Sequence, residues 1–373
     1  MTETRVRIER ASIRDFRNLD RVELELPERG LALVGENGQG KTNLLEALYY
    51  LQIMRSARGA RDQDLVRFGA SGFYVSARLA GARDTDIAVG FDANSKRKKF
   101  VRDGETVARL SDAFGSLPSV MFSPRDIELV SGSPAERRRF VDLVLALSSR
   151  RYLSALQHYR AALLRRNAAL RAAARRGGDE DAIAAWEPAL AEYGSAIACE
   201  RRQWIEANQE EFSRLCVAIG EESATRMEYV SALDGRGDVM AALARSLERN
   251  RSQDTRRGLT GSGPHRDDVA ITLDGRDIRA FGSAGQQRTA ATALRMLEAA
   301  TLRATASREP VLLLDDPFAE LDARRATRIL DLLTNRGLGQ TILAVPREAD
   351  IPSGLVSLER LRIRSGAITW DAA

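Results

Sequence analysis

The chain has 373 residues and a net charge of +5, with 44% apolar and 29% charged residues. This composition is typical of a globular protein with an extensive core, and no apolar run approaches the roughly 20 residues that a membrane-spanning helix needs. The first ten residues, MTETRVRIER, lack the apolar segment of a secretory signal, so we expect a cytoplasmic protein without a membrane partner. Two histidines and two cysteines are too few, at their spacing, for a His/Cys metal site.

The first motif reads GENGQGKTN and lies between an apolar run, GLALV, and a leucine-rich run, LLEALYYL. It matches the P-loop pattern G-x-x-x-x-G-K-[ST], which requires a strand before the loop and a helix after it. Such a loop wraps a phosphate with its backbone N–H groups, aided by the helix N-terminus. The predicted nucleotide-binding residues are Gly35, Glu36, Asn37, Gly38, Gln39, Gly40, Lys41, Thr42 and Asn43.

Lys41 is one of only four lysines in a chain that otherwise uses arginine. Its compact ammonium can reach between two phosphates inside a tight loop, where the planar fork of arginine would not fit. We therefore expect Lys41 to contribute directly to catalysis. The hydroxyl of Thr42 is expected to bind Mg²⁺.

The other three lysines fall in the cluster Lys96-Arg97-Lys98-Lys99, shortly before Asp103-Gly104. The Asp-Gly pair predicts a hairpin turn. Charge at the edge of a sheet discourages the addition of foreign strands, which is our interpretation of the cluster. Contact with phosphate is the alternative.

A helical insertion is predicted next. Ser133-Pro134-Ala135-Glu136 combines a capping box with proline at the first helical position, so a helix should begin there. The pattern runs to a turn at Gly177-Gly178 and resumes from about residue 179 to residue 220, with a bend at Pro188. Cys199 and Cys216 would lie about 25 Å apart on this second helix, too far for a disulfide, and are expected to be buried thiols.

The first arm of this insertion is rich in arginine and poor in acids. Two interpretations stay open: a solvated helix face, and a surface that contacts DNA phosphates. Glutamates of the second arm could pair with it. The arginines are Arg137, Arg138, Arg139, Arg150, Arg151, Arg160, Arg165, Arg166, Arg171, Arg175 and Arg176.

The stretch Val311–Asp316, VLLLDD, predicts a buried strand that ends in two acids. This is a Walker B pattern, the second carboxylate strand that a P-loop requires. Asp315 would hold Mg²⁺ directly or through water. Asp316 would orient or deprotonate the attacking water.

Two further segments resemble motifs of ABC-type ATPases. SAGQQ at residues 283–287 is similar to their signature motif, and Glu320-Leu321-Asp322 is similar to their D-loop. In that superfamily the signature serine and its helix N-terminus cap the γ-phosphate bound by another subunit. The resemblance thus implies an ATP-dependent homodimer, and a helix cap by the serine is compatible with that role. The nucleotide-contacting residues that it implies are Ser283, Gly285, Gln286 and Asp322.

Three more stretches resemble the RecF family, whose members are related to SMC heads. They are IRDFRN at residues 13–18, FSPRDIELVSGSPAERRRFVD at 122–142, and GPHRDD at 263–268. The resemblance implies dimerisation on ATP, binding to duplex DNA near single-strand gaps or junctions, and cooperation with RecR and RecO in loading RecA. It also implies that Arg17 and Asn18 lie near the nucleotide.

Departures from related ATPases bear on the rate of hydrolysis. Arg125 follows Pro124 where the family commonly has an acid, and no Q-loop glutamine stands there. The run TILAV is followed by Pro346-Arg347, without a switch histidine. Asp316 occupies the place of the usual catalytic glutamate, and its shorter side chain would hold water less closely. We therefore predict a weak, DNA-stimulated ATPase in which ATP acts as a dimerisation switch.

Together the motifs predict an α/β fold, namely an ABC-type, SMC-like P-loop ATPase head with an inserted, mainly helical lid or arm. The predicted divisions are 1–125 for the N-terminal part of the head, 126–255 for the insertion, and 256–373 for the C-terminal part. The predicted function is an ATP-dependent DNA-binding protein of recombinational repair and replication.

Two alternatives remain compatible with the motifs. The energising subunit of a membrane transporter shares the P-loop, signature and Walker B, although the long insertion and the missing glutamine and histidine argue against it. An SMC-like head could also act as a protein scaffold whose ATP state controls a partner nuclease. Co-purification with a permease would favour the first, and a pull-down of partners would favour the second.

Overall fold

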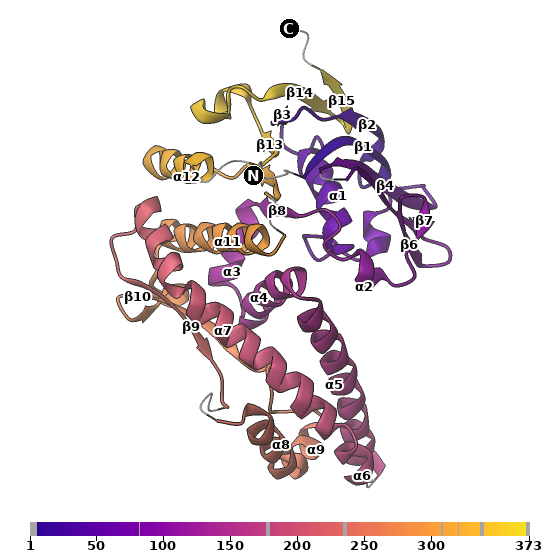
Figure 1. Cartoon of the computed structure of the whole chain (residues 1–373), viewed down its shortest axis with the longest axis vertical. Helices are drawn as coiled ribbons and strands as arrows, with labels where there is room; N and C mark the ends of the chain where they lie inside the picture. Colours follow the sequence, from indigo (N-terminus) through magenta and orange to yellow (C-terminus); the bar gives the residue numbers. More distant parts are fainter. Residues whose placement is uncertain are drawn as a thin grey trace. The chain divides into compact units, whose positions relative to one another are not determined.

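The computed structural model describes residues 6–81, 83–176, 180–233, 237–306, 309–319, 321–335 and 339–370. The chain folds into two compact units (Figure 1). Unit 1 comprises Met1–Asp126, Ala218–Gly220 and Leu294–Ala373, and unit 2 comprises Ile127–Val217 and Glu221–Ala293. The mixed α/β composition agrees with the predicted fold class.

A mainly parallel sheet in unit 1 carries the predicted motif strands. Its order is β15 (Ala367–Trp370), β14 (Glu359–Arg364), β3 (Gly30–Val34), β13 (Thr341–Val345), β12 (Val311–Asp315) and β8 (Ser119–Phe122), with only β15 antiparallel to its neighbour. Strands β3, β12 and β13 are buried throughout, which explains their continuous apolar sequences. The P-loop and the Walker B acids therefore lie at the same, carboxyl-terminal edge of the sheet, with β13 between them.

A second, antiparallel sheet completes the β structure of unit 1. Its order is β2 (Leu19–Glu25), β1 (Arg7–Phe16), β4 (Gly72–Ala80), β5 (Thr85–Asp92), β6 (Arg97–Arg102) and β7 (Glu105–Thr106). Asp103 and Gly104 join β6 to β7 with φ angles of 49° and 81°, so the predicted hairpin turn is confirmed. Lys98 does not fit the interpretation of its cluster as exposed charge at a sheet edge, because its ammonium pairs with Asp62 at 2.9 Å.

Helix α1 (Lys41–Ile53) packs against strands of both sheets. Every residue from Leu44 to Gln52 is buried, including the polar Glu46 and Gln52, and Leu44, Leu45 and Leu48 are inaccessible to solvent. Phe16 and Phe73 from the antiparallel sheet pack edge-on against Tyr50 of this helix. The helix that follows the P-loop is thus fixed by the main core of unit 1.

The other helices of unit 1 are short or lie near the C-terminus. They are η1 (Asp62–Leu65), α2 (Leu110–Ala113), α12 (Ala323–Asn335), η3 (Glu348–Asp350) and η4 (Ser353–Leu355). Helix η2 (Pro124–Ile127) and helix α11 (Ala284–Ala306) each contain a division between the two units.

Unit 2 is mainly helical (Figure 1). Its helices are α3 (Glu128–Ser131), α4 (Pro134–Ser148), α5 (Arg150–Arg176), α6 (Glu180–Ala184), α7 (Glu187–Ile219, through Val217), α8 (Val239–Arg249), α9 (Arg251–Arg257) and α10 (Ile278–Phe281). A small sheet has the order β11 (Arg276–Asp277), β10 (Asp268–Leu273) and β9 (Thr225–Val230). Helices α5 and α7 contact each other through stacked His158 and Tyr193.

The predicted helix start at Pro134 is confirmed, but two details of the insertion differ from prediction. Ser133 makes no side-chain capping bond, because the Glu136 N–H donates to the backbone carbonyl of Ser133 at 3.0 Å, and the Glu136 carboxylate pairs with Arg139 at 3.2 Å. The predicted first arm is two helices, which separate at Ser149. Pro188 lies in the first turn of α7, directly after the break that follows α6. The predicted turn at residues 177–178 lies outside the described residues.

The C-terminal part of unit 1 begins after Ala293, whereas the sequence predicted a division at 255/256. Strand β10 pairs with β9 along its whole length, from Asp268 opposite Val230 to Leu273 opposite Thr225. Arg137 of α4 also binds both carboxylate oxygens of Asp268, at 2.9 and 2.8 Å. These contacts keep the segment up to Ala293 with the helical insertion. The first division, after Asp126, lies one residue from the predicted one.

The two cysteines lie on α7 as predicted, but only one of them is buried. Burial raises the pKa of the Cys216 thiol to about 12. Cys199 is exposed, so its predicted burial is wrong. Within the described parts of the chain, no helix has the length and apolar character needed to cross a bilayer.

Candidate nucleotide-binding site

The P-loop connects β3 to α1 and needs glycine for two separate reasons. Gly38 and Gly40 have φ angles of 81° and 118°, which side chains disfavour. A Cβ atom on Gly35 would lie 2.5 Å from the carbonyl oxygen of Ile363, and one on Gly40 would lie 2.9 Å from the Asn18 side chain. The loop is therefore packed too closely for larger residues at either end.

Lys41 lies under this loop as the first residue of α1. Its ammonium donates to the carbonyl of Glu36 at 2.9 Å and to that of Gly35. Burial lowers the pKa of Lys41, while the nearby carboxylates of Asp315 and Asp316 act in the opposite direction. The ammonium thus contacts the glycine-rich loop directly and feels the charges of the Walker B acids.

Thr42 and Asp315 are in direct contact. The threonine hydroxyl donates to the Asp315 carboxylate at 2.9 Å. Burial raises the pKa of Asp315, and the hydrogen bond from Thr42 and the charge of Arg58 oppose that effect. A hydroxyl and a carboxylate are hard oxygen donors of the kind that Mg²⁺ prefers, so the two residues fit this ion. The structure brings the two predicted metal ligands together.

Asp316 follows directly at the end of β12. Its backbone N–H donates to the carbonyl of Ala344 at 2.9 Å, and its φ angle is 44°. The left-handed backbone is uncommon for a residue other than glycine and turns the chain sharply after the buried strand. Asp316 and Asp315 both influence the pKa of Lys41, which places both acids near the P-loop.

Asn18 supports the P-loop from the β1–β2 turn. Its side-chain nitrogen donates to the carbonyl of Gln39 at 3.1 Å, and its oxygen accepts from Asn43 at 2.7 Å. The carbonyl of Gln39 also accepts from Gly366, and its side chain accepts from the Ser365 N–H. The loop is held from both sides, by the β1–β2 turn and by the β14–β15 turn.

Arg17 reaches a residue that sequence reasoning missed, the buried Glu46 of α1. The guanidinium of Arg17 donates to Glu46 at 3.0 Å, and that of Arg58 donates to it at 3.0 Å and to Asn43 at 2.5 Å. Burial alone would raise the pKa of Glu46, but hydrogen bonds from Arg58, Ser56 and Arg17 keep the pKa below its usual range. A single acid within the apolar run LLEALYYL was the available signal.

The signature segment caps helix α11 in unit 2. The Gln286 N–H donates to the Ser283 hydroxyl at 3.3 Å, and the Gln286 side-chain oxygen accepts from the Ser283 N–H at 2.9 Å. This reciprocal pair is a capping box, so the predicted helix cap by Ser283 is confirmed. Gly285 lies in the first turn of the same helix.

Asp322 of the predicted D-loop caps helix α12 in unit 1. Its carboxylate accepts from the Arg325 N–H at 2.9 Å, and this backbone hydrogen bond lowers the pKa of Asp322. Glu320 of the same motif lies outside the described residues. The P-loop, Walker B and Asp322 thus belong to unit 1, whereas the signature segment belongs to unit 2.

The positions that depart from related ATPases have local partners. Asp126, next to Arg125, accepts from the partly exposed Arg295 of α11 at 2.7 Å. Arg347, after β13, pairs with Asp350 at 3.1 Å. Both segments are therefore held by ion pairs at the sheet edge where transporter ATPases would have glutamine and histidine.

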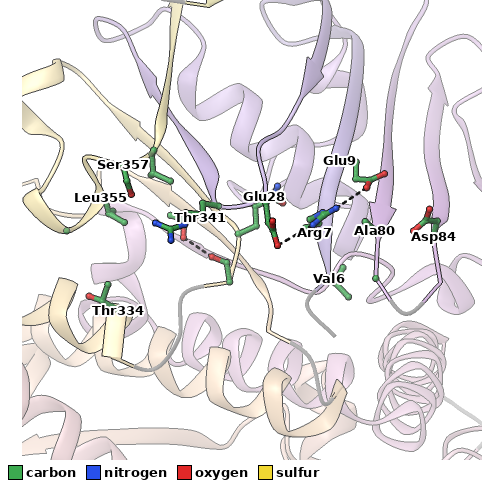
Figure 2. A pocket seen from close by; sticks show the side chains of 16 residues that line it. Val6, Arg7, Glu9, Glu28, Ala80, Asp84, Thr334, Thr341, Leu355 and Ser357 are labelled. Atoms are coloured by element: carbon green, nitrogen blue, oxygen red, sulfur yellow. Dashed lines mark hydrogen bonds and ion pairs between the residues drawn. The ribbon is translucent and has the colours of Figure 1, made fainter. Parts of the chain in front are cut away.

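A cavity of about 860 Å³ lies at the opposite edge of the parallel sheet (Figure 2). Thr341, the first residue of β13, and Arg29, just before β3, line it. Figure 2 shows Arg7 between Glu9 and Glu28, with which it pairs at 3.3 and 3.4 Å. This cavity is separate from the P-loop, because amino and carboxyl ends of parallel strands lie at opposite edges.

Two of the arginines predicted as either solvated or DNA-contacting are neither. Arg166 is inaccessible to solvent and pairs with Glu187 at 3.0 Å and with Asp254 at 2.7 Å. Arg137 is buried against Asp268. Both open interpretations are wrong for these residues, because each guanidinium joins distant parts of unit 2. The side chain of Arg176 lies outside the described residues.

The segment at residues 263–268 is held to the helices of unit 2 by hydrogen bonds. The His265 ring lies between the hydroxyl of Tyr159, at 2.6 Å, and the carbonyl of Thr260, at 3.0 Å. Arg201 of α7 donates to the carbonyl of Pro264 at 2.7 Å. These bonds fix the loop to α5 and α7.

Known proteins resemble the chain over nearly its whole length. The family model described as the RecF/RecN/SMC N-terminal domain matches residues 7–349. The DNA replication and repair protein RecF of Salinibacter ruber is 34% identical, and the match covers 96% of this chain and 90% of that protein. A solved structure of the recombination mediator protein RecF with ATP, in the RecFOR pathway, is 28% identical, with a TM-score of 0.91 and coverage of 99% and 98%.

An SMC head domain from Pyrococcus furiosus has the same fold, with a TM-score of 0.57, 17% identity, and coverage of 99% of this chain and 96% of that one. The similarity to RecF proteins extends far beyond the P-loop and Walker B strand, and it gives no support to the transporter alternative. The chain belongs to the RecF family of SMC-like, ABC-type ATPases.

Proposed function

We propose that this protein is an ATP-dependent DNA-binding protein of recombinational repair and replication. The observation that carries the proposal is the contact of Thr42, in a complete P-loop, with the Walker B residue Asp315 at 2.9 Å. Family membership supplies the biological setting, because the relative from Salinibacter ruber is a DNA replication and repair protein.

ATP with Mg²⁺ is the proposed ligand of the P-loop. The backbone of residues 35–43 would cradle the phosphates, and Lys41 would exchange its two carbonyl partners for phosphate oxygens. Thr42 and Asp315 would hold Mg²⁺, which when bound neutralises charge on the phosphates. Asp316 would orient the attacking water. Asn18 and Arg17 act on the site through Gln39 and Glu46, which they contact.

ATP-dependent dimerisation would complete the site. The signature segment presents the exposed Ser283 hydroxyl at the N-terminus of α11, a long helix whose dipole favours anions. Ser283, Gly285 and Gln286 of one subunit would cap the phosphates bound by the other, and Asp322 would lie at the same interface. Slow hydrolysis follows from the short side chain of Asp316, so ATP would serve as a switch.

DNA would bind the exposed arginines of the helical unit. Two helices present exposed arginines that form no ion pair with a carboxylate of the described residues. They are α5, with Arg171 and Arg175, and α9, with Arg256 and Arg257. The Arg171 side chain lies against Gly258, directly after α9, so the arginines of α5 lie close to those of α9. We call these four residues the α5–α9 arginine cluster. Clustered unpaired arginines match the charge of a phosphate backbone.

The remaining partners follow from the family. RecO and RecR are proposed because a similar structure is that of a protein of the RecFOR pathway. The preferred DNA would be duplex next to a single-strand gap, and RecA loading would be the outcome.

The test is binding of the purified protein to gapped and fully duplex DNA, with and without ATP-Mg²⁺. Lys41→Met is the control, because it removes the phosphate-binding cation. The proposal expects tighter binding with ATP that the variant loses, and a preference for the gapped DNA. No binding to either DNA, despite ATP-dependent dimerisation, would instead support the scaffold alternative.

A further inference from the structure

Glu221 is a buried carboxylate placed by the end of helix α7. Its relative exposure is 5%. The preceding Gly220 has a φ angle of 119°, and the Glu221 N–H donates to the carbonyl of Cys216 at 2.9 Å. This is the bond pattern of a Schellman motif, in which the residue after the glycine closes the last turn. The backbone of Glu221 is therefore fixed.

One oxygen of this carboxylate accepts two hydrogen bonds. Oε1 accepts from the Ser223 N–H at 3.1 Å and from the side-chain nitrogen of Gln286 at 3.2 Å. The other oxygen, Oε2, is buried and has no hydrogen-bond partner among the described residues. Glu221 thus connects the segment that follows α7, at Ser223, to Gln286 in the first turn of α11, and all three residues belong to unit 2.

The contact determines how the Gln286 amide is oriented. Because Glu221 Oε1 accepts this hydrogen bond, the glutamine turns its NH₂ group toward Glu221. Its oxygen then faces the Ser283 N–H, to which it is bonded at 2.9 Å. A reversed amide would place an oxygen against a carboxylate and an NH₂ group against an N–H donor. The carboxylate therefore selects the orientation that forms the capping box.

We propose that Glu221 is a positioning residue that preorganises the signature segment for ATP-dependent dimerisation. The inference rests on the proposed function, in which Ser283 caps a nucleotide bound by a second subunit. A signature loop that is already ordered loses less conformational freedom when the dimer forms. Glu221 acts through Gln286 and does not itself contact the nucleotide.

The first test compares Glu221→Ala with Glu221→Gln and with Glu222→Ala, which changes the adjacent exposed acid. Dimerisation with ATP is measured by sedimentation, and nucleotide affinity is measured on the monomer. Glu221→Ala should weaken dimerisation about tenfold, as expected for the loss of one or two hydrogen bonds, and leave nucleotide affinity unchanged. Glu221→Gln keeps an oxygen that can accept from both Ser223 and Gln286, so it should dimerise like the unmodified protein. The control Glu222→Ala should also dimerise normally.

A charge exchange gives a second test that general destabilisation would not mimic. Gln286→Glu places a second carboxylate at the 3.2 Å contact, so hydrogen exchange of residues 283–287 in the monomer should accelerate as strongly as in Glu221→Ala. Combining Glu221→Gln with Gln286→Glu restores a donor opposite an acceptor and should slow this exchange again. Exchange is measured in the monomer because Gln286 itself is proposed to face the phosphates of the second subunit. Exchange in the double variant as fast as in Gln286→Glu alone would overturn the inference.

The outcomes separate this inference from the proposed function. Dimerisation of Glu221→Ala equal to that of Glu222→Ala and the unmodified protein overturns the positioning role and leaves the proposed function intact. If the unmodified protein does not dimerise with ATP, the proposed function fails. In that case, hydrogen exchange of residues 283–287 decides the positioning role: Glu221→Ala should accelerate it about fivefold, and unchanged exchange would overturn that role too.

Discussion

The Thr42 hydroxyl donates a hydrogen bond of 2.9 Å to Asp315, although the two residues are 273 positions apart in the sequence. The contact exists because β3 and β12 belong to one parallel sheet and end at the same edge. Asp315→Asn should therefore remove the Mg²⁺-dependent part of ATP affinity and preserve folding, because the amide has almost the same shape. Titration of nucleotide with and without Mg²⁺ measures the effect. Equal Mg²⁺ dependence in both proteins would contradict the assignment.

Ser283→Arg should block ATP-dependent dimerisation without weakening nucleotide binding. The arginine would stand at the exposed N-terminus of α11, where the proposed dimer needs room for a phosphate, while the P-loop lies in the other unit. Sedimentation with ATP measures dimerisation, and Lys41→Met provides the opposite control, since it should lose nucleotide binding itself. A Ser283→Arg protein that still dimerises with ATP would refute the sandwich arrangement.

Glu46→Ala should destabilise the protein by roughly 3 kcal/mol, because it leaves Arg17 and Arg58 without their shared buried partner. The matched control is Glu25→Ala, whose carboxylate pairs with Arg10 on an exposed surface and should change stability by less than about 1 kcal/mol. Urea unfolding measures both. Similar values for the two variants would show that the Glu46 cluster contributes no more than a surface pair.

His265 predicts a pH dependence of stability. Burial lowers the pKa of His265 to about 4, whereas an unfolded histidine titrates near 6.5. Between these values the unfolded chain binds more protons, so this residue's contribution is fully present above about pH 6.5 and is lost as pH falls toward 4. The slope is at most about 1.4 kcal/mol per pH unit. His265→Gln should remove it, and His158→Gln, which changes an exposed histidine, should not.

The α5–α9 arginine cluster predicts the salt dependence of DNA binding. Replacing Arg171, Arg175, Arg256 and Arg257 by alanine should reduce the slope of log K against log salt by about 0.9 for each phosphate that the protein no longer neutralises. The control replaces Arg10, Arg61 and Arg347, which are exposed but paired with Glu25, Asp64 and Asp350. Equal slopes for the cluster variant and the unmodified protein would place the DNA elsewhere.

The sequence predicted the elements whose signals are local. The run GLALV followed by GENGQGKTN specifies a strand, a phosphate-type loop and a helix, because each depends on neighbouring residues alone. The two acids after VLLL are equally local, and the cap at Ser283 requires only a glutamine three residues later. Ser283 and Lys41 are therefore recognisable as functional candidates from their neighbours in the chain.

Only the tertiary structure decided which charged side chains are buried and which groups surround them. Arg166 and Arg171 belong to the same arginine-rich helix, but one is enclosed by Glu187 and Asp254 and the other is exposed. Glu46 and Glu221 likewise gain their roles from Arg58 and Gln286, which lie elsewhere in the chain. The physical reason is that burying a charge requires a partner of suitable geometry, and partners distant in sequence are determined by the packing of helices and sheets.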